Sequence, residues 1–150
     1  MSQIKFFNPN KNFYKFMQQF KDRILIDAGA GIGHVTGALI DRGYKIVAID
    51  LYPPISMRCP GKIKPLIQMF DATRFPYPEG SIVLIIRPCH SDWILQTAKY
   101  AWDRKARVIY IGLQKNVEID FYDDMFQYKE IGNNLGKQKE VAIEIGGNYE

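Results

Sequence analysis

Residues 23 to 33 read RILIDAGAGIG, and this stretch decides the fold. Arg23 to Asp27 is a short apolar run, as expected of a buried strand, and closely spaced glycines follow it at once. From Val35 to Arg42 the apolar positions repeat at helical spacing, and Gly43 stands where a helix commonly ends. The pattern predicts a strand, a tight loop and a helix, in that order.

The next segments extend this unit into an α/β sheet. Tyr44 to Ile49 is rich in β-branched residues and ends at Asp50, which gives the second strand of a strand–helix–strand unit. A third apolar run, Leu66 to Phe70, follows prolines at positions 53, 54, 60 and 65. Because proline disfavours a regular helix, we expect an irregular connection before this strand. The opening half is predicted to be doubly wound.

The middle of the chain continues the alternation of strand and helix. Ile82 to Ile86 is uniformly apolar, as expected of a central fourth strand buried on both faces. Ser91 is placed to cap a helix that runs from Asp92 to about Arg104, and Val108 to Leu113 supplies a fifth strand.

The two ends of the chain carry their own signals. Asn12 to Phe20 places aromatic residues and Met17 at helical spacing, which indicates a short helix packed on the core. Met125 to Ile131 and Val141 to Ile145 flank a stretch rich in Gly, Asn and Lys, which suggests an antiparallel hairpin. We expect one domain over residues 1–150, with residues 1–22 as an N-terminal helical segment.

Composition narrows the class of protein. A hydrophobic fraction of 47% and a charged fraction of 24% are ordinary for a globular domain. The net charge of +4 is modest for a dedicated nucleic-acid binder. No apolar run approaches the ~20 residues of a membrane span, so we expect a cytoplasmic protein without a membrane partner. Cys59 and Cys89 are too few for a disulfide framework, and no spacing indicates a metal site.

The glycine loop predicts a nucleoside site. Glycines let a ligand approach the backbone closely, and the start of the following helix offers N–H donors. At the end of the next strand, Asp50 has lone pairs on both oxygens for the two hydroxyls of a ribose. A dinucleotide loop, G-x-G-x-x-G, would need glycine at position 34, where His34 stands, and this argues against NAD. We expect His34 to face solvent.

With these motifs the chain resembles the class I S-adenosylmethionine-dependent methyltransferases over roughly residues 23 to 146. Their first motif, an acidic residue followed by G-x-G-x-G, matches Asp27 to Gly33. An acidic residue ending the second strand matches Asp50, and one following the third strand matches Asp71. The resemblance implies a mostly parallel Rossmann-like sheet in the order 3-2-1-4-5-7-6, with an antiparallel hairpin at the C-terminus and reduced helices.

The resemblance also implies roles for individual residues toward S-adenosylmethionine. Asp27 would orient the loop and meet the amino end of the methionine moiety, and Asp50 would bind the ribose hydroxyls. Asp71 would bond the adenine amino group, with Leu51 and Ala72 beside the ring. The implied cofactor site comprises Asp27, Gly29, Ala30, Gly31, Gly33, Asp50, Leu51, Asp71, Ala72 and Arg87.

The end of the fourth strand, where the family holds its methyl acceptor, reads RPCHSD from Arg87. It lacks the Asp/Asn/Ser-Pro-Pro-aromatic motif that the amino-methylating nucleic-acid enzymes of the family carry here, which disfavours that subclass. Cys89 after a proline resembles the nucleophile of the cytosine-C5 enzymes, but Lys115 replaces the glutamate that assists attack. His90 is the more economical catalytic base, because an unperturbed imidazole has a pKa near 6.5 and could accept a proton at neutral pH. Arg87 would either bind an acidic substrate or pair with a carboxylate.

Three hypotheses about function remain open from the sequence. The first is a methyltransferase acting on a small molecule, a nucleic acid or a protein. The second is a non-catalytic S-adenosylmethionine-binding subunit that regulates or scaffolds a partner subunit, since the fourth strand ends in an unusual motif. The third is an NAD-dependent oxidoreductase, because Asp50 could bind the ribose of NAD as well as that of S-adenosylmethionine.

Overall fold

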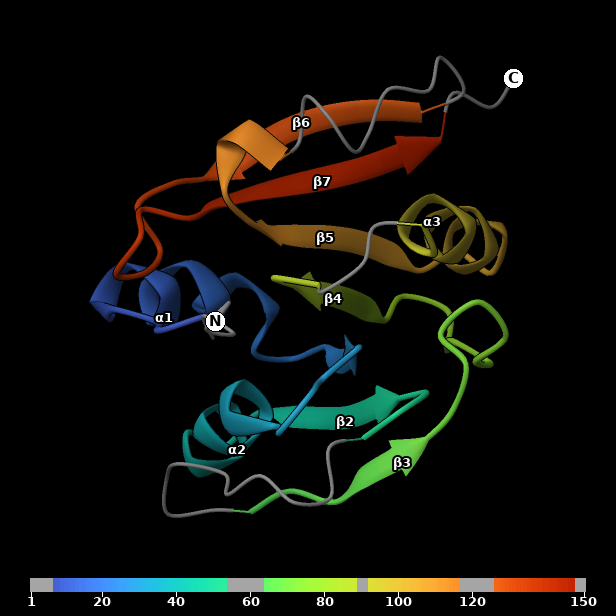
Figure 1. Cartoon of the computed structure of the whole chain (residues 1–150), viewed down its shortest axis with the longest axis horizontal. Helices are drawn as coiled ribbons and strands as arrows, with labels where there is room; N and C mark the ends of the chain where they lie inside the picture. Colours follow the sequence, from blue (N-terminus) through green and yellow to red (C-terminus); the bar gives the residue numbers. More distant parts are fainter. Residues whose placement is uncertain (1–6, 54–63, 89–91, 117–125, 148–150) are drawn as a thin grey trace, which may run out of the picture.

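A computed structural model describes residues 7–53, 64–88, 92–116 and 126–147 of the chain. Seven strands form one sheet in the order β3-β2-β1-β4-β5-β7-β6 (Figure 1). They are β1 (Ile24–Ala28), β2 (Lys45–Asp50), β3 (Ile67–Met69), β4 (Ile82–Ile86), β5 (Arg107–Gly112), β6 (Phe126–Gly132) and β7 (Val141–Gly147). Strands β1 to β5 pair in parallel, and β7 runs antiparallel to both β5 and β6. The predicted strand order and terminal hairpin are confirmed.

The helices of the described part lie on both faces of the sheet. They are α1 (Lys11–Met17), which continues as the 3-10 turn η1 (Gln18–Phe20), α2 (His34–Asp41) and α3 (Ile94–Asp103). Helices α1 and α2 cover one face and α3 covers the other (Figure 1). Within the described ranges, no helix has the length and apolar character that crossing a membrane requires.

Helix α3 begins two residues later than its predicted start at Asp92. Its N-cap is Trp93, whose side chain makes no capping hydrogen bond, and residues 92 and 93 form a turn. The predicted cap, Ser91, lies outside the described residues, as does most of the connection before β3 that was expected to be irregular.

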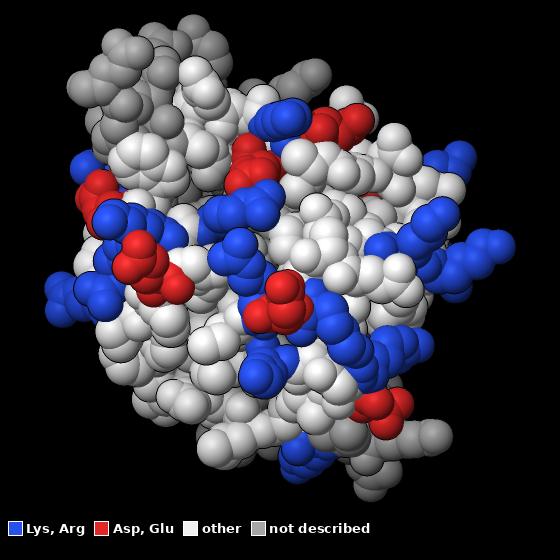
Figure 2. Space-filling model, turned by 180° about the vertical axis from the view of Figure 1, so that it is seen from behind, with Lys and Arg blue, Asp and Glu red and all other residues white. Residues whose placement is uncertain are grey.

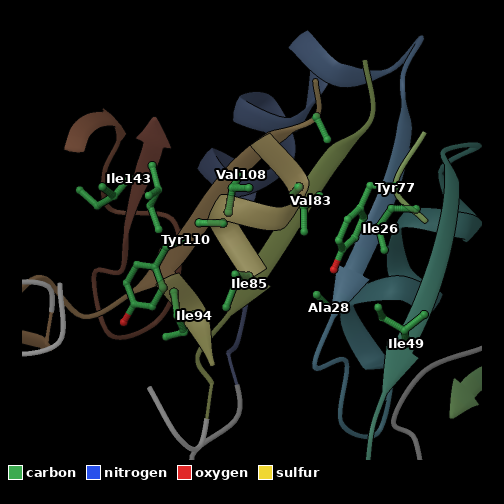
Figure 3. Packing of buried hydrophobic residues seen from close by; sticks show 14 of the residues in the cluster. Ile26, Ala28, Ile49, Tyr77, Val83, Ile85, Ile94, Val108, Tyr110 and Ile143 are labelled. Atoms are coloured by element: carbon green, nitrogen blue, oxygen red, sulfur yellow. The ribbon is translucent and has the colours of Figure 1, made fainter. Parts of the chain in front are cut away.

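Alternate residues of the central strands build two apolar layers, one on each face. In β4, Ile82 and Leu84 pack with α1 and α2, whereas Val83 and Ile85 pack toward α3. Figure 3 shows the second layer, to which β1, β2, β4, β5 and β7 contribute side chains together with Ile94 of α3. Because both faces are covered, the central strand β4 is apolar at every position rather than alternating with polar residues.

The N-terminal segment is part of the core, as predicted. Phe13, Met17 and Phe20 are almost fully buried, and Phe7 is buried beside them. The segment also contacts the connection between β6 and β7, where the backbone N–H of Asn10 donates to a carbonyl oxygen. Residues 7–20 therefore pack against both α2 and the end of the sheet.

Candidate functional site

The glycine loop after β1 has a left-handed backbone at each of its three glycines. Gly29, Gly31 and Gly33 have φ angles of +73°, +60° and +79°, a region that other residues rarely adopt. A Cβ atom on Gly33 would lie 2.7 Å from Cγ of Pro65, so this position has no room for a side chain. At Gly31, no described atom other than those of the glycine and its two chain neighbours comes within 4 Å of the Cβ position. The loop is tightly folded and open to a ligand at Gly31.

Backbone hydrogen bonds tie the loop to the end of β2. The N–H groups of Gly29 and Ala30 both donate to the carbonyl oxygen of Ile49, at N···O distances of 2.9 and 3.0 Å. The N–H of Gly33 donates to the carbonyl of Ala30 at 3.0 Å, which closes the turn into α2. These bonds fix the loop beside Asp50, the next residue of β2.

Asp50 completes this side of the site. The N–H of Gly31 donates to its Oδ2 at 2.9 Å, and the N–H of Tyr52 donates to its Oδ1 at 2.8 Å. An ionised carboxylate has about four acceptor positions, so each oxygen can take a further hydrogen bond. The carboxylate lies beside the open space at Gly31, as an adenosine ribose would require. Loop and carboxylate thus fit the cofactor implied by the sequence.

Asp27 lies beneath the loop and is only 3% exposed. The hydroxyl of Thr36, in α2, donates to its Oδ2 at 2.7 Å. Burial raises the pKa of Asp27 to about 6, opposed by the Thr36 hydrogen bond and helped slightly by the negative charge of Asp50. Asp27 therefore joins β1 to α2, consistent with its predicted role of orienting the loop. Its contact with a methionine moiety remains a prediction.

Asp71 closes a local turn after β3. The N–H and the hydroxyl of Thr73 both donate to its Oδ1, at 2.9 and 2.7 Å, and these bonds lower the pKa of Asp71. The N–H of Phe70 donates to the backbone carbonyl of Asp50 at 3.2 Å, which brings this turn to the same edge of the sheet. Asp71 thus has a structural role in addition to the adenine contact predicted for it.

The two residues predicted beside the adenine ring differ in exposure. Leu51 is 44% exposed and offers apolar surface next to Asp50. Ala72 is half-buried, and its carbonyl oxygen accepts a hydrogen bond of 2.7 Å from the Tyr77 hydroxyl. Both residues lie at the carboxyl ends of β2 and β3, where open α/β sheets bind ligands.

Arg87, at the end of β4, makes an ion pair. Its Nη1 lies 3.5 Å from Oε2 of Glu140, whose side chain is only 1% exposed, and 3.3 Å from Oε1 of Gln138. Its backbone is left-handed, with φ of +44°, and its N–H donates to the carbonyl of Ile111. Of the two roles left open by the sequence, pairing with a carboxylate is the one found here. The predicted catalytic residues Cys89 and His90 lie outside the described residues.

One prediction near the loop was wrong. His34 does not simply face solvent: it is half-buried, and its Nε2 lies 2.7 Å from the carbonyl oxygen of Phe7. The reason is the buried N-terminal segment, which places that carbonyl against the start of α2. Because the contact joins residues far apart in the chain, no local pattern predicts it.

Three residues of the site were missed by sequence reasoning. Thr36 bonds Asp27, Glu140 pairs with Arg87, and the indole of Trp93 lies against Gly29. The first two were invisible because their partners lie on other elements. Trp93 falls inside the helix predicted from Asp92, and its contact with the loop joins two elements far apart in the sequence. Among the described residues, no cluster of His, Cys, Asp or Glu could hold a metal ion.

Solved structures show that the chain has the class I S-adenosylmethionine-dependent methyltransferase fold. The 23S rRNA methyltransferase ErmE matches with a TM-score of 0.61 and 13% identity over 97% of this chain and 71% of that chain. A putative methyltransferase, yhhF from Escherichia coli, matches with 0.59 and 13% identity over 93% and 88% of the two chains. Magnesium protoporphyrin IX methyltransferase (ChlM) from Synechocystis PCC 6803, with bound SAM, matches with 0.52 and 13% identity over 99% and 86%. No family model and no curated protein matches the sequence.

Proposed function

We propose that this chain binds S-adenosylmethionine across the glycine loop and transfers its methyl group to an acceptor. One observation carries the proposal: the Asp50 carboxylate accepts a hydrogen bond from the N–H of Gly31, the glycine of the loop whose Cβ position no described side chain approaches within 4 Å. Structural neighbours with the same fold include a methyltransferase with bound SAM, which supports the choice of cofactor. When bound, the cofactor supplies an electrophilic methyl group on a positively charged sulfur.

The residues of the chain would divide the binding between them. Asp50 would accept hydrogen bonds from the ribose hydroxyls. The ligand would lie along the backbone of the loop, at Gly29, Ala30, Gly31 and Gly33. Asp27 would hold the loop in place from below and face the amino end of the methionine moiety. Leu51, Asp71 and Ala72 would contact the adenine, because the turn after β3 and the end of β2 meet at one edge.

Methyl transfer asks little chemistry of the protein. The displacement is in line, so the chain orients the acceptor and supplies a base only when the acceptor atom carries a proton. We assign that base to His90 and treat a nucleophilic Cys89 as the alternative. Arg87 remains a residue of the acceptor side, where it can act on an acidic substrate only if its ion pair with Glu140 rearranges.

The charges on the face drawn in Figure 2 do not single out a nucleic acid as the acceptor. Figure 2 shows Lys and Arg side chains spread over one face, with Asp and Glu side chains among them. A dedicated nucleic-acid surface is usually a patch of one sign. We therefore propose the acceptor only as a nucleophile, which can belong to a small molecule, a nucleic acid or a protein.

A second candidate function is a cofactor-binding subunit without catalysis of its own. It is favoured by the pairing of Arg87 with Glu140, because this ion pair occupies the charged side chain that the structure describes at the end of β4. Such a subunit would bind the cofactor through the same residues and complete an acceptor site with a partner chain.

Two measurements test the proposal. Calorimetry with S-adenosylmethionine, S-adenosylhomocysteine and NAD should show binding of the first two and no competition by NAD; tight binding of NAD alone would contradict it. Labelled cofactor incubated with RNA, DNA, protein and small-molecule pools should then label one pool. Transfer only in the presence of a partner protein would favour the second candidate.

A further inference from the structure

Trp93 reaches the glycine loop from the opposite half of the molecule. It is the N-cap of α3, is half-buried and packs against the apolar layer under that helix. Its Cζ2 and Cη2 atoms both lie 3.1 Å from the position of a Cβ on Gly29. The indole therefore rests against the first glycine of the loop and forms a wall there.

The contact is made by the edge of the indole. Apart from Gly29 and its two chain neighbours, these are the only described atoms within 4 Å of the Gly29 Cβ position. A ring lying flat on the glycine would bring further ring atoms within that distance, because neighbouring ring carbons are about 1.4 Å apart. The indole of Trp93 is thus not stacked on Gly29 through a π face.

From this contact we propose that Trp93 is a positioning and specificity residue that recognises the positive charge of the cofactor's sulfonium through its π face. The inference rests on the proposed function, which brings a cationic ligand to this loop. Aromatic faces attract cations, tryptophan most strongly, and the attraction grows when the pair is withdrawn from water. Asp27 and Asp50 flank the same loop, so their negative charge favours a cation at this place as well.

The two cofactor forms offer a direct probe of charge recognition. S-adenosylmethionine carries the sulfonium, whereas S-adenosylhomocysteine is a neutral thioether of nearly the same shape. Removing the π face should therefore weaken the first more than the second. For Trp93→Leu we expect the affinity for S-adenosylmethionine to fall roughly threefold to thirtyfold, with a smaller loss for S-adenosylhomocysteine. Trp93→Phe should keep part of the preference, since phenylalanine retains a weaker π face.

A matched control lies on the same helix. Trp102 is the other tryptophan of the chain, nine residues further along and roughly 14 Å away on the helix axis. Trp102→Leu should leave the ratio of the two affinities unchanged. In Trp102→Phe, Trp93 is the sole tryptophan, so its fluorescence should change saturably as S-adenosylmethionine is added. In Trp93→Phe, the remaining signal from Trp102 should stay constant.

The outcomes separate this inference from the function beneath it. If the unmodified protein binds neither cofactor form, the proposed function fails. If it binds both, and Trp93→Leu and Trp93→Phe leave the ratio of affinities as it was, Trp93 does not read the charge. Should Trp93→Leu fail to fold, the ratio of affinities in Trp93→Phe and the fluorescence of Trp93 in Trp102→Phe still test the inference. A fluorescence signal that does not respond to bound cofactor would overturn the placement of Trp93 at the site.

Discussion

The two halves of the sheet's carboxyl edge use acidic residues differently. At the ends of β1 and β2, Asp27 and Asp50 surround an open loop, and Asp50 bonds backbone N–H groups while keeping acceptor capacity. At the ends of β4 and β5, Glu140 is buried and paired with Arg87. In the first half, the carboxylate of Asp50 keeps acceptor positions for a ligand. In the described part of the second half, the carboxylate of Glu140 is taken up by the ion pair with Arg87. Under the proposed function, different halves of this edge would bind the cofactor and the methyl acceptor.

The largest effect is expected on the acceptor half, in the chemical step. If the protein is active, His90→Ala should lower turnover by about 10²–10⁴-fold, because it removes the proposed base, and should affect cofactor affinity less. Cys89→Ser should keep substantial activity. Single-turnover assays on both variants check this. Loss of turnover in Cys89→Ser, together with a covalent adduct between the unmodified protein and a fluorinated cytosine substrate, would assign the chemistry to the thiol.

The next effect concerns the cofactor half and the pH. The folded pKa of Asp27, about 6, lies above its ordinary value of 3.8, so the native state holds this proton more tightly than the unfolded chain. This group therefore destabilises the fold most above pH 7, and the penalty disappears as the pH falls through 6 toward 3.8. The full penalty is about 3 kcal/mol, from roughly two pKa units.

Asp27→Asn should remove that pH dependence while keeping an oxygen that accepts the Thr36 hydroxyl. Its free energy of unfolding should exceed that of the unmodified protein by up to about 3 kcal/mol at pH 8, and the gap should shrink toward pH 4. Urea unfolding at several pH values measures the difference. A gap that does not depend on pH would show that Asp27 titrates in its ordinary range.

A smaller effect tests whether the ion pair of Arg87 with Glu140 contributes to the free energy of unfolding. Arg87→Ala leaves Glu140 buried without its partner, and we expect a loss of about 2 kcal/mol in the free energy of unfolding. Adding Glu140→Gln should recover part of the loss. Lys99→Ala is the control, because Lys99 and Asp103 form an exposed pair worth at most a few tenths of a kcal/mol. Cofactor affinity should change less than it does in Asp50→Ala; a larger change would place Arg87 in the cofactor site.

The sequence predicted the sheet well because its central strands are buried on both faces. Runs such as Ile82 to Ile86 are apolar at every position, and a strand with two covered faces requires that pattern. The loop was equally readable, since its three left-handed positions call for glycine. Asp50 followed from its place directly after an apolar run.

Contacts between distant elements could not be predicted in the same way. The bond from Thr36 to Asp27, the pairing of Glu140 with Arg87 and the contact of Trp93 with Gly29 depend on how loops turn. Periodicity shows which face of an element is buried, but not which polar group lies opposite. The start of α3 was misplaced for a related reason, because a serine beside an apolar repeat predicts a cap whether or not the helix begins there.

The most direct test of the central claim is the affinity of Asp50→Ala for S-adenosylhomocysteine, measured by calorimetry beside the unmodified protein. The matched control is Asp41→Ala, which removes an exposed carboxylate of α2. We predict that Asp50→Ala folds and binds about tenfold or more weakly, because charge-assisted hydrogen bonds are lost, while Asp41→Ala binds normally. Unchanged affinity in a folded Asp50→Ala protein would contradict the placement of the ribose at Asp50.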